Sequence, residues 1–279
     1  MLIQILNGLV HGSLLYIVSV GLVLIFGLRR VANFAHGGLF MLGAYVCYAV
    51  SLKVGFWAGL VIAILVLTVL GVLLDRFVFR LLQDEDPIIT VLVTFGLLLV
   101  IEDVTRAIWG NGLLKLQVPD LLTGVILISG TNFPIYRVAI IGVAITVGLG
   151  LSLWLRYSRV GLFVRASSVD PVTTGMQGVN TEKLGMVVVG IGAGLAGLAG
   201  TVAAPLLALS PNMGASILMD CFIVVVTGGL SSFTGAFIAA MLIGQLHNFG
   251  VVFVPTIASL IPLLLMVSVL LWRPQGLAK

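Results

Sequence analysis

The chain has 279 residues, of which 60% are hydrophobic and only 9% are charged. A soluble globular domain carries about 25% charged residues, so this composition excludes a water-soluble surface over most of the chain. The net charge is +4, from 14 Lys and Arg against 10 Asp and Glu. In a membrane protein such an excess reflects the orientation of loops, and we expect no nucleic-acid partner.

The apolar runs, taken in chain order, predict an all-α integral membrane protein with about eight transmembrane helices, because each span needs roughly 20 apolar residues. The expected spans are 2–28, 36–52, 56–80, 88–108, 136–156, 184–204 and 256–272, and two short segments, 216–228 and 233–249, lie between the last two. Segment 216–228 has only 13 residues, so a helix there reaches about 20 Å, and we expect it to be short or re-entrant. Residues 109–135 predict a loop. All of these segments are expected to form a single transmembrane domain, residues 1–279.

The basic residues predict an orientation with the N-terminus outside and the C-terminus in the cytoplasm. With each segment crossing once, ten Lys and Arg residues fall inside and four fall outside, which is the sense of the positive-inside rule. The four outside are Lys53, Arg106, Lys115 and Arg137.

Acidic residues are scarce in the apolar segments. Asp220 is expected to be the only one well within such a segment, where it lies either near an interface or toward a polar interior. Glu102 and Asp103 stand near the end of a span, within reach of Arg106, which predicts an interfacial ion pair.

Enzymatic motifs are missing from the sequence. It contains no phosphate-binding loop, no zinc-protease motif and no nucleophile elbow, and its histidines, His11, His36 and His247, are scattered. We therefore expect neither an enzyme nor a metal site, and ATP hydrolysis is not expected of this chain.

The stretch "VANFAHGGLFMLGAY", residues 31–45, places polar residues and glycines where a span should begin. We expect Gly37 and Gly38 to allow an interruption of the helix, and Asn33 and His36 to hydrogen-bond the freed backbone groups beside the translocation path. The alternative is that Asn33 and His36 only cap the start of the span. A similar pattern in "GGLSSFTGAFIAAMLIG" makes Ser231 and Ser232 further pathway candidates.

Two other patterns bear on packing and partners. Repeated small residues in "GMVVVGIGAGLAGLAG" predict closely packed helices, with the lining of a narrow passage as the alternative.

The one long polar stretch, 157–182, contains a helix start, because Asp170 can cap backbone N–H groups, Pro171 suits the first helical position and Gly178 can end the helix. Its apolar residues indicate either a loop folded on the membrane surface or a docking element for a soluble partner.

The chain resembles the permease subunits of bacterial branched-chain amino acid ABC transporters, the LivH type. The resemblance runs over nearly the whole chain and rests on "NGLVHGSLLYIVSVGLVLIFG", "NFAHGGLFMLGAY", "RYSRVGLFVRASSVDP", "VVTGGLSSFTGAFIAAMLIG" and the closing "RPQGL". It implies a location in the bacterial inner membrane and a path shared with a second homologous permease. It also implies two cytoplasmic ATPase subunits, which bind the ATP, and an extracytoplasmic solute-binding protein.

The same resemblance gives the polar stretch a role. It implies a cytoplasmic coupling helix that begins at Asp170-Pro171, with Arg165 and Gly178 in the same coupling segment. The following residues, "VTTGMQG", depart from the Ala- and Leu-rich pattern of the family, and they predict a short helix or one that depends on its partner for order.

The resemblance also favours branched-chain or other hydrophobic amino acids as substrates. The alternative function is a stand-alone channel or secondary carrier for a small polar solute such as urea or an amide.

Overall fold

The computed structural model describes residues 1–83, 85–128 and 130–278. Within them, eight helical segments are long and apolar enough to cross a membrane, as the sequence predicts. They are α1 (Leu2–Arg29), α2 (Ala35–Val54), α3 (Phe56–Leu74) continued by the π-helical turn η1 (Asp75–Phe79), α4 (Pro87–Trp109), α5 (Ile135–Tyr157), α8 (Thr181–Ala203), α10 (Phe233–Phe253), and η3 (Pro255–Leu260) continued by α11 (Ile261–Trp272).

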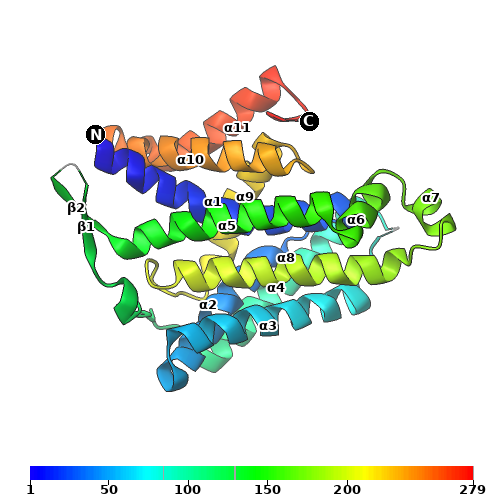
Figure 1. Ribbon diagram of the computed structural model, residues 1–279, viewed down its shortest axis with the longest axis horizontal. Helices are drawn as coiled ribbons and strands as arrows, with labels where there is room; N and C mark the ends of the chain where they lie inside the picture. The colour runs from blue at the N-terminus through cyan, green and yellow to red at the C-terminus, as the bar shows by residue number, and fades with distance from the viewer. Residues whose placement is uncertain (84, 129, 279) are drawn as a thin grey trace.

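The long helices lie side by side, and the bundle has two distinct ends (Figure 1). One end, here the hairpin end, carries the N-terminus and a β-hairpin of β1 (Val125–Ile128) and β2 (Thr131–Pro134), near the short η2 (Asp120–Leu122). The other, the α7 end, carries the short helices α6 (Arg159–Val169) and α7 (Pro171–Met176).

The hairpin differs from the irregular loop expected for 109–135. Val125 pairs with Pro134 and Ile128 pairs with Thr131 in antiparallel register. The run "VILI" is rich in β-branched residues, which favour strands, and Gly130 adopts φ +80°, which glycine reaches at no steric cost. These local signals are short, and they are hidden in a mixed composition.

Helices α1 and α8 form the centre of the bundle, and α1, α2 and α3 all pack on α8. A Cβ atom on Gly43 of α2 would lie 2.6 Å from the Cα of Gly197 of α8, so the two backbones touch where neither residue has a side chain. The expected close packing of small residues is therefore confirmed. Many large apolar side chains of α3, α4, α5 and α11 are exposed, which suits helices that face lipid.

The chain between α1 and α2 is not helical, and after the exposed Arg30 it is buried or partly buried. Val31 and Asn33 are at most 2% exposed, and the Thr94 hydroxyl of α4 donates to the Ala32 carbonyl at 3.1 Å. His36, in the first turn of α2, bonds the Val18 carbonyl of α1, about 16 Å from the end of α1 at a rise of 1.5 Å per residue. Helix α2 therefore starts inside the bundle, where protein covers the irregular backbone.

Helix α9 (Met213–Gly228) also starts inside the bundle. Gly214 in its first turn touches Gly37 of α2, and the Glu102 carboxylate of α4 accepts a hydrogen bond from the Ala215 N–H at 3.2 Å. At its other end, the Thr227 carbonyl accepts from the N–H of Leu277 in the C-terminal segment. Helix α9 thus runs from the interior of the bundle to the C-terminal segment, and with 16 residues it is short, as expected.

Candidate coupling surface and buried polar contacts

Two capped helices make up the polar stretch 157–182, where the sequence indicated one. The Ser158 hydroxyl accepts from the Gly161 N–H at 2.8 Å and starts α6. Asp170 starts α7: one carboxylate oxygen accepts from the backbone N–H groups of Val172 and Thr173, each at 3.0 Å, and the other accepts from the Thr173 hydroxyl at 2.5 Å. These hydrogen bonds, first that of the Thr173 hydroxyl, hold the pKa of Asp170 below its usual value.

The start and the end of α7 agree with the sequence prediction. Pro171 occupies the first turn of the helix, where its missing N–H costs nothing. Gly178 follows the end of the helix with φ +85°, and its N–H donates to the Gly175 carbonyl at 3.0 Å. The helix is only six residues long, as the weak helix formers after Pro171 predict.

Helix α7 and the residue before its cap expose large apolar side chains at the end of the bundle. Val169, Val172 and Met176 are 80%, 66% and 82% exposed, and we call these three residues the coupling surface. Beside it lies a groove of about 610 Å³ between α6, α7 and the start of α8, lined among others by Phe163 and Val187. An apolar group at a loop tip next to a groove is typical of a protein-binding surface.

Arg165 and Ser231, predicted for coupling and for the pathway respectively, lie at one hollow. It measures about 470 Å³, and it is lined also by Gly27 of α1 and Arg156 of α5. Ser232 instead caps α10, because its hydroxyl accepts from the Gly235 N–H at 3.1 Å. Residues far apart in sequence thus meet at the α7 end of the bundle.

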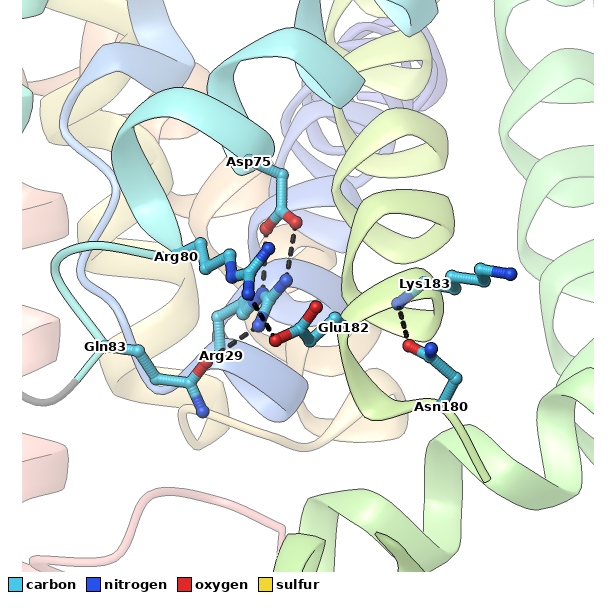
Figure 2. Close-up of polar contacts among 7 residues, drawn as sticks. All are labelled: Arg29, Asp75, Arg80, Gln83, Asn180, Glu182 and Lys183. Carbon is cyan, nitrogen blue, oxygen red and sulfur yellow. Dashed lines mark hydrogen bonds and ion pairs between the residues drawn. The ribbon is translucent and has the colours of Figure 1, made fainter. Parts of the chain in front are cut away.

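A buried ion pair lies near this end (Figure 2). The Arg29 guanidinium of α1 donates to both carboxylate oxygens of Asp75, at 2.7 and 2.5 Å, and to the Gln83 side-chain carbonyl at 2.7 Å. The Arg29 side chain is 5% exposed and that of Asp75 is 0% exposed. The guanidinium also packs on Gly185 of α8, where a Cβ would collide with it.

Exposed contacts surround the buried pair. Arg80 and Glu182 form an ion pair at 2.5 Å, and their side chains are about half exposed. The Asn180 side chain accepts from the Lys183 N–H at 2.9 Å and caps α8 (Figure 2). The ends of α1, α3 and α8 are therefore joined at one place.

Sequence reasoning missed the Arg29–Asp75 pair. Asp75 lies inside the predicted span 56–80 and is completely buried, so the expectation that Asp220 is the only deep acidic residue is wrong. The available signal was that Asp75 and Arg29 stand near span ends that the predicted orientation places on the same side. A buried carboxylate there requires a cation.

Arg30 links α1 to α6. It adopts φ 54°, which is unusual for a residue with a side chain, and its guanidinium donates to the Ser168 carbonyl at 3.2 Å. Ser168 is two residues before the Asp170 cap. Two consecutive arginines, Arg29 and Arg30, thus connect the end of α1 to the π-helical turn after α3 and to α6.

The polar residues and glycines of the stretch 31–45 do not make the contacts expected of them. The helix is interrupted at residues 30–34, whereas Gly37 and Gly38 lie within α2 and permit close contact with α9 and α4. His36 bonds a carbonyl of the uninterrupted α1, and α2 has no side-chain cap. In the part of the chain that the structure describes, neither polar side-chain atom of Asn33 has a partner. The expected bonds to freed backbone groups are therefore wrong, and so is the capping alternative.

No arrangement for a metal ion is found in the described ranges, since no three His, Cys, Asp or Glu residues are grouped suitably. Cys47 and Cys221 are free and buried. Asp103 pairs with Arg106 at 2.6 Å, as expected for the end of α4. The Glu102 carboxylate instead accepts a hydrogen bond from α9.

The fold and these contacts define an all-α, multi-span membrane protein. A family model described as "Branched-chain amino acid transport system / permease component" matches residues 4–270, and the chain belongs to this family, which is one of transport permeases and not of enzymes.

Curated relatives agree with the family. The chain is 26% identical to the high-affinity branched-chain amino acid transport system permease protein BraD of Pseudomonas aeruginosa, and equally to LivH of Escherichia coli; each alignment covers 98% of this chain and 94% of the relative. It is 25% identical to a probable branched-chain amino acid transport permease protein LivH of Methanocaldococcus jannaschii, over 98% of this chain and 91% of the relative. No solved structure matches the chain.

Proposed function

We propose that this chain is a transmembrane permease subunit of an ATP-driven ABC importer. Together with a second homologous permease it forms the path for branched-chain or other hydrophobic amino acids. Two cytoplasmic ATPase subunits dock at the α7 end, and an extracytoplasmic solute-binding protein delivers substrate at the hairpin end. The proposal is supported by the family to which the chain belongs and by the transport systems after which its relatives are named.

The proposed orientation places the N-terminus outside and the α7 end in the cytoplasm of a bacterium, with the spans in the inner membrane. The chain binds no ATP itself, because the phosphate-binding loop belongs to the partner ATPases. Arg156, Arg159, Arg165 and Lys183 are exposed at the α7 end, in agreement with the bias of cytoplasmic segments toward basic residues.

The observation that carries the proposal is the capped helix α7 with its exposed coupling surface. Val172 and Met176 are exposed, and covering them with a partner contributes roughly 25 cal/mol per Å² of apolar surface buried. Because Asp170 and Pro171 define where α7 begins, the apolar side chains are presented on a formed helix rather than on a disordered loop. Presentation on a formed helix lowers the entropic cost of docking.

The contacts around Arg29 and Arg30 provide a route from the docked segment to the spans. A displacement of α6 reaches α1 through the Ser168–Arg30 hydrogen bond, and α1 is fixed to the end of α3 by the Arg29–Asp75 pair. A partner drives such a change only if its two nucleotide states bind the two permease conformations with different free energies.

Reconstituted vesicles test the proposal with the variant Asp170→Lys/Pro171→Gly. We expect the variant permease to assemble with its partners, while the solute-binding protein and leucine no longer stimulate ATP hydrolysis and uptake is lost. The control is Asp170→Asn, whose amide oxygen can accept the same backbone hydrogen bonds from Val172 and Thr173 and which should leave coupling unchanged. Normal coupling in the double variant would contradict docking at α7. Leucine flux through vesicles that hold this chain alone would instead indicate a stand-alone carrier.

A further inference from the structure

Polar side chains meet between α1 and α10, from the N-terminus inward. The Asn248 amide of α10 donates to the backbone and side-chain carbonyls of Gln4 at 2.7 and 3.0 Å. Seven residues further along α1, the imidazole rings of His11 and His247 lie 4.9 Å apart between centroids, with a tilt of 31°. All four side chains are partly accessible. These four side chains form a row that runs from the hairpin end into the bundle, and we call this row the polar ladder.

Glycines bring the two helices together at this ladder. Gly244 of α10 lies against the backbone of Gly8 and Gly12 of α1, where an added Cβ would collide. The Gln245 amide donates to the Ile5 carbonyl at 2.9 Å. The two histidines are thus held as a pair by the backbone packing of their helices.

Asp220 lies on α9, which packs against both α1 and α10. Its carboxylate is partly accessible and near enough to His247 for their charges to interact. Ser216 and Met219, on the same side of α9, are exposed. Since α9 has 16 residues, it is about 24 Å long, shorter than the hydrocarbon core of a bilayer.

An acidic side chain against lipid is costly, and such residues normally face a protein interior or a water-filled cavity. The accessible side of α9 therefore faces water or a partner protein. Short helices that begin within the membrane are typical of the binding sites of transporters.

We propose that Asp220, together with His11 and His247, forms a site within the translocation path that binds the charged backbone groups of an amino acid. This inference rests on the proposed function and adds the residues that contact the substrate. The Asp220 carboxylate accepts hydrogen bonds from the substrate ammonium group, and an imidazole N–H donates to its carboxylate. Met219, which is 60% exposed, contacts the apolar side chain.

Leucine uptake by the complete transporter in vesicles tests this site. We expect Asp220→Asn to raise the leucine concentration for half-maximal uptake, or lower the uptake rate, by about tenfold, the effect of losing one charge-assisted hydrogen bond. His11→Gln/His247→Gln should act in the same direction, whereas Asp103→Asn, in an exposed pair, should not. ATP hydrolysis stimulated by the binding protein should persist in Asp220→Asn, since α7 is intact.

Unchanged uptake by both the Asp220 and the double histidine variants, with an active wild type, would overturn the site and leave the proposed function standing. A wild-type complex without ATP-dependent uptake would instead overturn the proposed function, and the site with it.

A second measurement covers the case in which the variants do not assemble. In a chain with Cys47→Ala and Cys221→Ala, a small charged thiol reagent should modify Ser216→Cys from water, and saturating leucine should slow the reaction. Reaction only with a lipid-soluble maleimide would show that this side of α9 faces lipid, and would overturn the site.

Discussion

Arg29 and Asp75, separated by 46 positions, form an ion pair that is almost completely removed from solvent and joins the end of α1 to the π-helical turn after α3. A π-helical turn is a local distortion of a helix that is often found at functional positions. Here it begins at the residue that Arg29 holds. The pair thus fixes two spans at the end of the bundle where α6 and α7 lie.

Breaking this pair should strongly destabilise the protein. We expect Asp75→Asn to lower the free energy of unfolding in detergent by about 3–5 kcal/mol, because a buried guanidinium loses its counter-charge. Asp103→Asn removes an exposed partner of Arg106 and should cost at most about 1 kcal/mol. Denaturant titration of the purified permease measures both values.

The double variant Arg29→Met/Asp75→Leu separates stability from coupling. Replacing both charges by apolar side chains should recover most of the lost stability, while uptake stays low because α1 and α3 no longer move together. If the double variant transports at the wild-type rate, the pair is only structural.

Close backbone packing between α2 and α8 should make Gly43 sensitive to a single methyl group. Gly43→Ala places a Cβ 2.6 Å from the Gly197 Cα, and such overpacking costs about 1–3 kcal/mol. Gly96 of α4 has no atom within 4 Å of an added Cβ, so Gly96→Ala should gain up to about 1 kcal/mol from helix propensity. Equal melting temperatures for the two variants would contradict this packing.

Asn33 provides a test of the pathway prediction. Its buried side chain has no hydrogen-bond partner among the described residues, so Asn33→Leu should leave the free energy of unfolding unchanged or raise it by about 1 kcal/mol. If Asn33 contributes to the path, leucine uptake should nevertheless fall.

The matched control for Asn33 is Thr94→Val. The Thr94 hydroxyl lies within hydrogen-bonding distance of the Ala32 carbonyl, at 3.1 Å, and of the Thr90 carbonyl of its own helix, at 2.9 Å. Its loss should cost about 0.5–1.5 kcal/mol. A destabilised Asn33→Leu, or one with normal uptake, would argue against a pathway role.

Some of the features behind these tests could be predicted from the sequence, and others could not. The spans and the Asp170–Pro171 helix start follow from local signals, which are the length of apolar runs and the chemistry of one cap. The start of α2 inside the bundle, the contact of Gly37 with α9 and the partner of Arg29 depend on how helices pack. The spacing of residues along the chain does not encode that packing. The break in the helix was therefore expected at Gly37-Gly38, but it lies at residues 30–34.

The cap of α7 should respond to acid. The pKa of Asp170 lies below its usual value of 3.8 because Thr173 donates to the ionised form, so the cap stabilises α7 fully above about that pH and is lost as the pH falls through the lower folded value. Hydrogen exchange at the Val172 and Thr173 amides, corrected for intrinsic rates, should show constant protection from pH 7 to 5 and a loss of protection only at pH values below 3.8. Asp170→Asn should remove this transition; a transition near pH 6 would contradict the assignment.

Labelling of Met176→Cys decides whether the coupling surface meets a cytoplasmic partner. In a chain with Cys47→Ala and Cys221→Ala, the new thiol sits where the native side chain is 82% exposed, and Val125→Cys on the hairpin serves as the control for the opposite face. An impermeant maleimide should label Val125→Cys on intact cells, and Met176→Cys only in inside-out vesicles, more strongly once the ATPase subunits are stripped off. Labelling of Met176→Cys on intact cells, or no protection by the ATPases, would contradict docking at α7.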